Sequence, residues 1–98
     1  MRDPRILQAV KESLEVLVTK APGRAIEVRI PPYAAVQCGD GPTHIRGTPA
    51  NVIEMDATTW LALANGELVW AEALSSGAIQ ASGVRADLTE YLPLRIMS

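Results

Sequence analysis

The segment from Asp56 to Gly83 constrains the fold of this chain more than any other stretch. Its pattern predicts a helix, a glycine stop, a second short helix, another glycine stop and a strand. Asp56 can cap the first helix by accepting a hydrogen bond from a free backbone N–H. Gly66 and Gly77 follow the two helices, because glycine adopts the left-handed conformation of a helix end at little cost. The segment is rich in apolar side chains and has almost none of the side chains typical of catalysis. This composition favours binding of an apolar molecule over a catalytic function.

The rest of the chain predicts one long helix and several short strands. Residues 4–20 have apolar side chains at helical spacing, after Asp3 and Pro4, which are typical of a helix start. Alternation over 24–30 predicts a half-buried strand, and Gly39-Asp40-Gly41 predicts a hairpin turn. Further expected elements are strands over 33–38, 43–46, 49–55 and 78–82, and a helical turn or two within 85–92. This order predicts an α/β (α+β) fold: a mostly antiparallel sheet of about five strands, with helices packed on one face.

Length and composition exclude several classes of protein. The chain has 98 residues, so a single domain over 1–98 is expected, with a core of about 24–94 behind the helix at 4–20. Hydrophobic residues make up 48%, yet no run approaches a membrane span, and no secretory leader is apparent. A net charge of −2 lacks the excess of basic residues that is typical of nucleic-acid-binding proteins. One cysteine, Cys38, cannot form an internal disulfide, which fits the cytoplasm.

Several segments together resemble the sterol carrier protein (non-specific lipid-transfer) family. The matching pieces in the helical segment are Asp56, Trp60-Leu61-Ala62-Leu63, Gly66, Ala73, Ser76-Gly77 and Ala78 to Gly83. The compact, mostly actinobacterial branch is similar at Val28 to Tyr33, Ala35 to Cys38, His44 to Pro49, Asn51 to Asp56 and Leu92 to Leu94. The resemblance spans about residues 20 to 94. It implies a sterol-carrier-like fold and a small module that binds a lipid or another hydrophobic molecule without catalysis.

Candidate catalytic and metal sites are weak in this sequence. His44 is the single histidine, and pairing with Cys38 would lack a third group to orient the base. One histidine and one cysteine fall short of the three or four ligands of a zinc site. Gly39-Asp40-Gly41 is followed by Pro42 rather than by a helix, so a hairpin turn is preferred to a phosphate cradle. No cofactor, metal or enzymatic activity is therefore expected.

Two hypotheses remain for the apolar residues of the helical segment. Some of them line a ligand cavity between the helices and the sheet, or the same residues form a filled core of an accessory or interaction domain. The candidate lining residues are Trp60, Leu63, Leu68, Trp70, Leu74 and Ile79. A polar rim for a head group is a further candidate at His44 and Arg46, while Arg24, Arg29 and Arg85 are scattered along the chain. The oligomeric state is left open.

Overall fold

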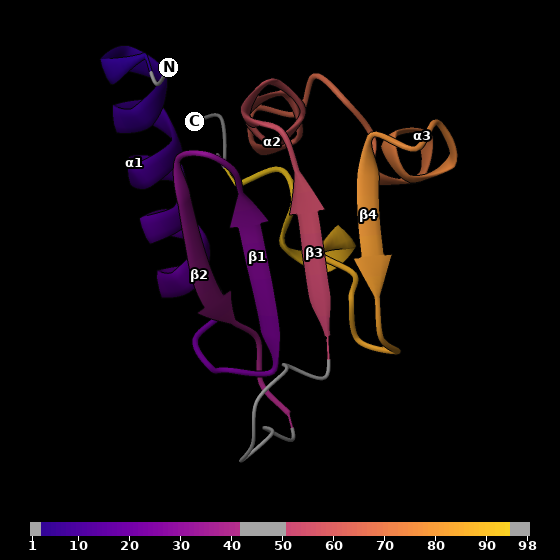
Figure 1. Ribbon diagram of the computed structural model, residues 1–98. Coiled ribbons are helices and arrows are strands. Elements are labelled where there is room, and N and C mark those ends of the chain that lie inside the picture. Colours follow the sequence, from indigo (N-terminus) through magenta and orange to yellow (C-terminus); the bar gives the residue numbers. More distant parts are fainter. Residues whose placement is uncertain (1–2, 42–50, 95–98) are drawn as a thin grey trace.

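The computed structural model describes residues 3–41 and 51–94 and consists of one sheet and a layer of helices (Figure 1). The predicted long helix is confirmed from its first to its last residue. In chain order the elements are α1 (Pro4–Lys20), β1 (Ile26–Ile30), β2 (Ala34–Cys38), β3 (Val52–Met55), α2 (Ala57–Ala64), α3 (Trp70–Ser75), β4 (Ile79–Ser82) and the 3-10 turn η1 (Thr89–Tyr91).

The sheet has the strand order β2-β1-β3-β4 and is mostly antiparallel, as predicted. β1 pairs antiparallel with β2, and β3 pairs antiparallel with β4, whereas the central pair β1–β3 is parallel. The expected count of about five strands is corrected: the described residues form four. The candidate fifth strand, 43–46, was the shortest of the expected strands, and it falls outside the described residues.

One face of the sheet is apolar and the other is polar. Along β1, Ile26, Val28 and Ile30 are buried, while Glu27 and Arg29 between them are half-exposed on the opposite face. This is the alternation that a strand with one covered face requires. The helices lie over the apolar side, with α1 against β2 and α2, and α3 against β4. Within the described residues, no helix is both long and apolar enough to cross a bilayer.

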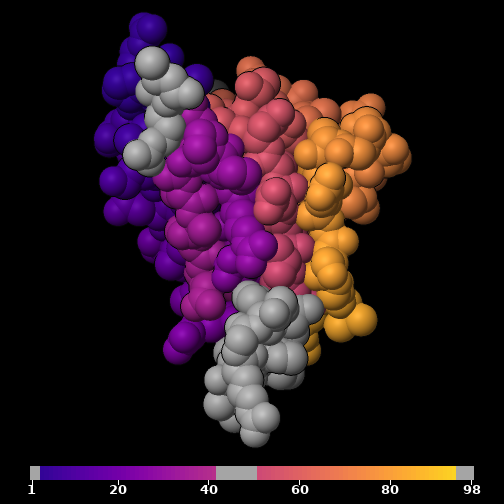
Figure 2. Space-filling view, viewed as in Figure 1, coloured from indigo at the N-terminus to yellow at the C-terminus, as the bar shows by residue number. Residues whose placement is uncertain are grey.

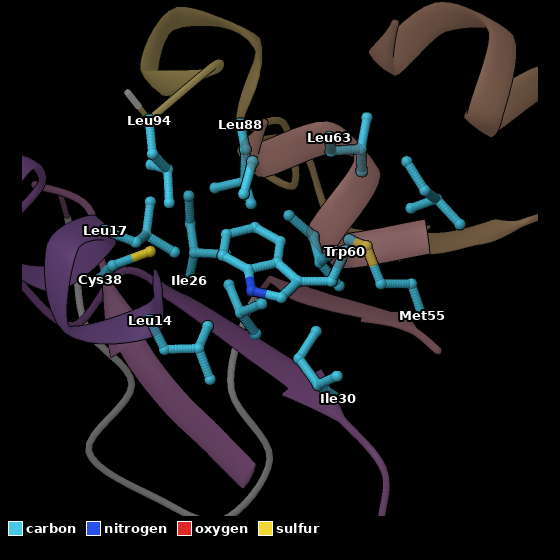
Figure 3. Packing of buried hydrophobic residues seen from close by; sticks show 14 of the residues in the cluster. Leu14, Leu17, Ile26, Ile30, Cys38, Met55, Trp60, Leu63, Leu88 and Leu94 are labelled. Carbon is cyan, nitrogen blue, oxygen red and sulfur yellow. The ribbon is translucent and has the colours of Figure 1, made fainter. Parts of the chain in front are cut away.

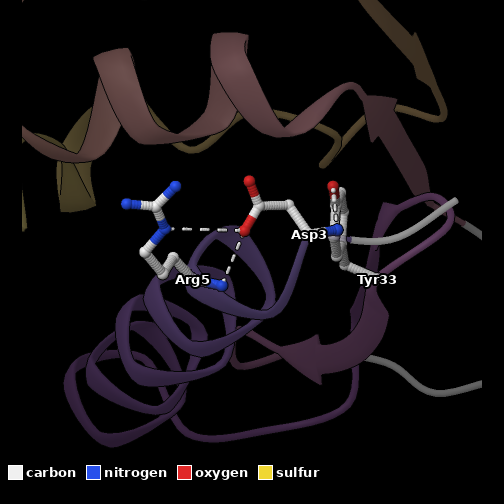
Figure 4. A network of polar contacts seen from close by, with 3 residues as sticks. All are labelled: Asp3, Arg5 and Tyr33. Atoms are coloured by element: carbon white, nitrogen blue, oxygen red, sulfur yellow. Dashed lines mark hydrogen bonds and ion pairs between the residues drawn. The ribbon is translucent and has the colours of Figure 1, made fainter.

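Both ends of α1 are tied to distant parts of the chain. At its start, the side chain of Asp3 accepts a 2.8 Å hydrogen bond from the backbone N–H of Arg5, and the backbone N–H of Asp3 donates to the Tyr33 hydroxyl at 3.4 Å (Figure 4). At its end, the Lys20 ammonium donates to the carbonyls of Tyr91 and Pro93 at 3.0 and 3.2 Å. The segment after η1 is thereby held against α1.

The cap predicted for α2 is present. The carboxylate of Asp56 accepts a 2.8 Å hydrogen bond from the backbone N–H of Thr59, and this bond lowers the pKa of Asp56. Met55 before the cap and Trp60 after it are both buried in the same cluster, as a hydrophobic staple requires. Gly66 has the positive φ of a helix end, +80°. The first helical unit of the segment therefore follows its sequence signals closely.

The turn residues around Gly39 pack against the loop that precedes β1. Gly39 donates its backbone N–H to the carbonyl of Ala21 at 2.8 Å and accepts from the N–H of Ala25 at 3.1 Å. Gly23 lies so close that an added Cβ would be 1.9 Å from the Gly39 carbonyl oxygen. Residues 42–50 lie outside the described part, so the predicted hairpin turn stays a prediction.

Candidate functional site

The apolar layer between the sheet and the helices is the candidate site. Trp60 lies in the middle of the buried side chains drawn in Figure 3, among residues from α1, β1, β3 and the segment after β4. Its side chain is 0% exposed. Leu88 and Leu94, from the final part of the described chain, complete this layer. Residues from both ends of the chain therefore enclose one indole ring.

The six predicted lining residues are not equally buried. Trp60, Leu63, Trp70 and Ile79 belong to the buried core, and Leu68 is partly buried against it. Leu74 lies on the outside of α3 and is 44% exposed. Trp60 and Leu63 come from α2, which packs against α1, whereas Trp70 opens α3, which packs against β4. The set is therefore spread from α2 through α3 to the edge strand β4, which carries Ile79.

A hydrogen bond links the central tryptophan to α1. The indole N–H of Trp60 donates to the hydroxyl of Ser13 at 2.8 Å. Ser13 in turn can donate to the carbonyls of Ala9 or Val10, at 2.8 and 2.9 Å, within its own helix. A buried indole N–H usually finds such a partner. Sequence reasoning did not find Ser13, because no local pattern signals a partner in another helix.

The side of α1 that carries Ser13 borders an open hollow. This hollow lies between α1 and α2 and has a volume of about 240 Å³. A second hollow of about 570 Å³ continues along α1 and shares Glu12, Val16 and Leu94 with the first. The remaining residues around the first hollow are Ala9, Ser13, Leu61, Ala64 and Asn65. Its walls are mainly apolar. Ser13, one of its lining residues, accepts the hydrogen bond from the Trp60 indole.

Comparison with known protein families shows to which family the chain belongs. The family described as "Bacterial SCP ortholog", where SCP stands for sterol carrier protein, matches residues 3–94. The chain belongs to this bacterial sterol carrier protein family. No curated protein matches the chain.

A polar hollow near β1 was not foreseen from the sequence of this family member. It measures about 380 Å³. Beside it, the buried Asn51, which is 3% exposed, joins the residue before β1 to one of the lining residues. The Asn51 amide donates to the Ala25 carbonyl at 2.8 Å and its oxygen accepts from the Arg85 backbone N–H at 2.9 Å. A buried asparagine beside β3 is the signal that could have indicated this junction. The hollow is lined by Ile26, Gly39, Asp40, Arg85, Asp87, Thr89, Glu90 and Tyr91.

The described arginines serve separate local contacts. Arg24 donates to the side chain of Gln37 at 3.1 Å, and Arg29 pairs with Glu27, which raises the pKa of Arg29. Arg85 borders the polar hollow beside Gly41. His44 and Arg46, the predicted polar rim, lie outside the described residues. The described part of this family member therefore brings no arginine cluster together.

Cys38 is unsuited to nucleophilic chemistry. Its side chain is 0% exposed, and burial raises the pKa of the thiol to about 11. A thiol with that pKa stays protonated near neutral pH, whereas the thiolate is the nucleophile and metal ligand. Residues 3–41 and 51–94 contain no group of three or more His, Cys, Asp or Glu side chains able to hold a metal ion. Cys38 belongs to the packed core of the sterol carrier fold.

Proposed function

We propose that the chain is a small non-catalytic module that binds a lipid or another hydrophobic molecule. The observation that carries this proposal is membership of the bacterial sterol carrier protein family over residues 3–94. The apolar layer between the sheet and the helices supports it. Aliphatic and indole walls offer contact to acyl or sterol-like surfaces, whereas few polar groups are available to hold a polar substrate.

The ligand enters, in this proposal, through the hollow between α1 and α2. Val16, 46% exposed, and Leu61 give that hollow an apolar entrance. A ligand that separates α1 from α2 exchanges the Trp60–Ser13 hydrogen bond for contact with the indole. From there Leu63, Leu68, Trp70 and Ile79 are the proposed continuation of the lining, whereas Leu74 on the outside of α3 is left out of it. The polar rim at His44 and Arg46 remains a prediction.

The alternative function is an accessory or interaction domain with a filled core. One specific observation favours it: Trp60 is completely buried and its N–H already has a partner. A core of that kind stabilises a scaffold and needs no ligand. The two functions differ in whether the layer around Trp60 opens to admit a molecule.

The same proposal covers cellular setting and catalysis. A single buried cysteine supports a reducing cytoplasm, and the net charge of −2 supports partners other than nucleic acid. The protonated thiol of Cys38 supports the absence of cysteine-based turnover.

Native mass spectrometry of the chain purified from its own host tests the proposal. We expect a fraction of the protein to carry a hydrophobic adduct above the 10.5 kDa chain mass, and the delipidated protein to regain it from supplied fatty acids or sterols. Val16→Asp places a charge in the entrance and is expected to reduce adduct retention at least tenfold. Val84→Asp is the matched control, because Val84 is 100% exposed and lines neither hollow beside α1.

The outcomes separate the two functions. Retention of a ligand that is lost in Val16→Asp and kept in Val84→Asp supports the carrier and its entrance. Retention that both variants keep supports a carrier with another entrance. The absence of any adduct, from the host or from supplied lipids of several classes, favours the scaffold.

A further inference from the structure

The outer edge of β4 has backbone groups that no strand of the described residues pairs with. β4 is last in the order β2-β1-β3-β4 and pairs with β3 alone. Alternate N–H and C=O groups of such an edge strand point away from the sheet and form a template for another strand. We propose that this edge binds a second copy of the chain through an antiparallel β4–β4 pair about a two-fold axis.

The sequence around β4 lacks the usual protection of an edge. From Ala73 to Val84 the chain has no Asp, Glu, Lys, Arg or Pro. Proteins commonly place charges or proline on exposed edge strands to prevent pairing with other chains. The opposite edge of the sheet differs, because α1 packs against β2. β4 is therefore the edge strand whose backbone is available to pair with a strand of another chain.

Apolar side chains gather around this unprotected edge. Within the described residues, Val69 is 60% exposed, Leu74 is 44% exposed and Val84 is 100% exposed. Val69 and Leu74 flank or belong to α3, which lies beside the start of β4, and Val84 follows its end (Figure 1). Figure 2 shows α3 and β4 together along one margin of the molecule. Exposed apolar side chains therefore lie at both ends of this edge strand, Val69 and Leu74 at its start and Val84 after its end.

The positions of these residues are self-complementary under a two-fold axis. Antiparallel pairing sets the end of one β4 beside the start of the other, so that Val84 of each copy approaches α3 of its partner. A two-fold interface requires this reciprocity. This reciprocity of Val84 and α3 favours a second copy over an unrelated strand.

The size of the interface sets the expected strength of the dimer. β4 has four residues, and stable interfaces bury roughly 1,200–2,000 Å² in total. The strand pair therefore depends on the added contact of Val84 with the partner's α3. We expect a dimer that forms reversibly with rising concentration, with one continuous sheet running across both copies.

Sedimentation velocity over a concentration series up to about 1 mM tests the proposal. The wild type is expected to move from the 10.5 kDa chain mass toward twice that value. Val84→Lys and Ala81→Lys each place a charge at the pairing edge and are expected to raise the dissociation constant at least tenfold. Gln8→Lys is the matched control, because it adds the same charge to an exposed residue of α1 outside the proposed ligand entrance, and it should dimerise like the wild type.

Amide hydrogen exchange identifies the edge that pairs. Residues 79–82 should exchange more slowly at high than at low protein concentration, while residues 34–38 should be unaffected. Circular dichroism verifies that each variant folds. If Ala81→Lys does not fold, the result for Val84→Lys tests the proposal by itself, because the Val84 side chain is fully exposed. A wild type that stays a monomer throughout, a Val84→Lys dimer as strong as the wild type, or concentration-dependent protection of β2 instead of β4 would each overturn the proposal.

Discussion

The indole N–H of Trp60 donates a 2.8 Å hydrogen bond to the hydroxyl of Ser13, 47 residues earlier in the chain. The bond joins α2 to α1 across the apolar layer. It also lies next to the hollow that Ser13 helps to line. The same contact therefore stabilises the fold and stands at the proposed ligand entrance.

Replacing Ser13 by alanine is expected to destabilise the protein. The change removes the acceptor of a buried N–H, and leaving such a group unpaired costs about 1–3 kcal/mol. Ser75→Ala is a suitable control, because Ser75 is exposed at the end of α3 and should change stability by less than about 0.5 kcal/mol. Urea unfolding followed by circular dichroism measures both. Equal stability of the two variants would show that the bond contributes nothing.

Gly23 and Gly77 should respond very differently to alanine. Both have positive φ, +136° and +85°, but a Cβ on Gly23 would lie 1.9 Å from the Gly39 carbonyl oxygen, whereas one on Gly77 meets nothing within 4 Å. We expect Gly77→Ala to cost about 1–2 kcal/mol from backbone strain alone. Gly23→Ala should cost clearly more or prevent folding, because backbone must move. Thermal melting compares the two, and similar melting temperatures would contradict the described turn.

The cap of α2 should make stability depend on pH. The Thr59 N–H lowers the pKa of Asp56 below its unfolded value of about 3.9, so the carboxylate stabilises the fold above that pH. This stabilisation is lost as the pH falls through the lower, folded-state pKa. Asp56→Asn keeps a cap without a titrating group.

The free energy of unfolding of wild type minus that of Asp56→Asn should therefore decrease as the pH falls from about 6 to 2. Urea titrations at intervals across this range provide the measurement. A difference that stays constant with pH would show that Asp56 does not titrate through this cap.

Cys38 should resist modification in the folded protein. Burial raises its pKa to about 11, from an ordinary value of 9.0. At pH 8 the native thiol is expected to react with a disulfide reagent at least a hundredfold more slowly than in urea. Because the pKa of Cys38 is higher in the folded state, the protonated thiol stabilises the fold below about pH 9. This stabilisation is lost as the pH rises above about 9. Rapid modification of the native protein would place Cys38 outside the core.

Local signals account for the elements that the sequence predicted well. Asp3 and Pro4 start α1, and Asp56 caps α2, through bonds to residues only two or three positions away. Helical spacing also explains why Leu63 and Ala64 are buried together with Trp60, since residues three and four positions apart share one side of α2. These predictions required information from a single turn of helix.

Long-range contacts account for what the sequence did not reveal. Ser13 and Trp60 meet only when α1 packs on α2, and Asn51 bonds to Ala25 and Arg85 across the sheet. Leu74 has the helical spacing of a core residue after Trp70, yet it is exposed because the six-residue α3 packs against an edge strand. Periodicity specifies a face of a helix, but it does not specify how far the sheet extends beneath it.

Titration of Trp60 fluorescence tests the central claim, that the apolar layer admits a hydrophobic ligand. In a Trp70→Phe background the remaining indole reports on the α1–α2 side alone. We predict that a long-chain fatty acid or a sterol shifts this emission saturably and raises the melting temperature, since a ligand that binds only the native state stabilises it. An unchanged emission and melting temperature with every lipid class supplied would contradict the claim and leave a filled scaffold.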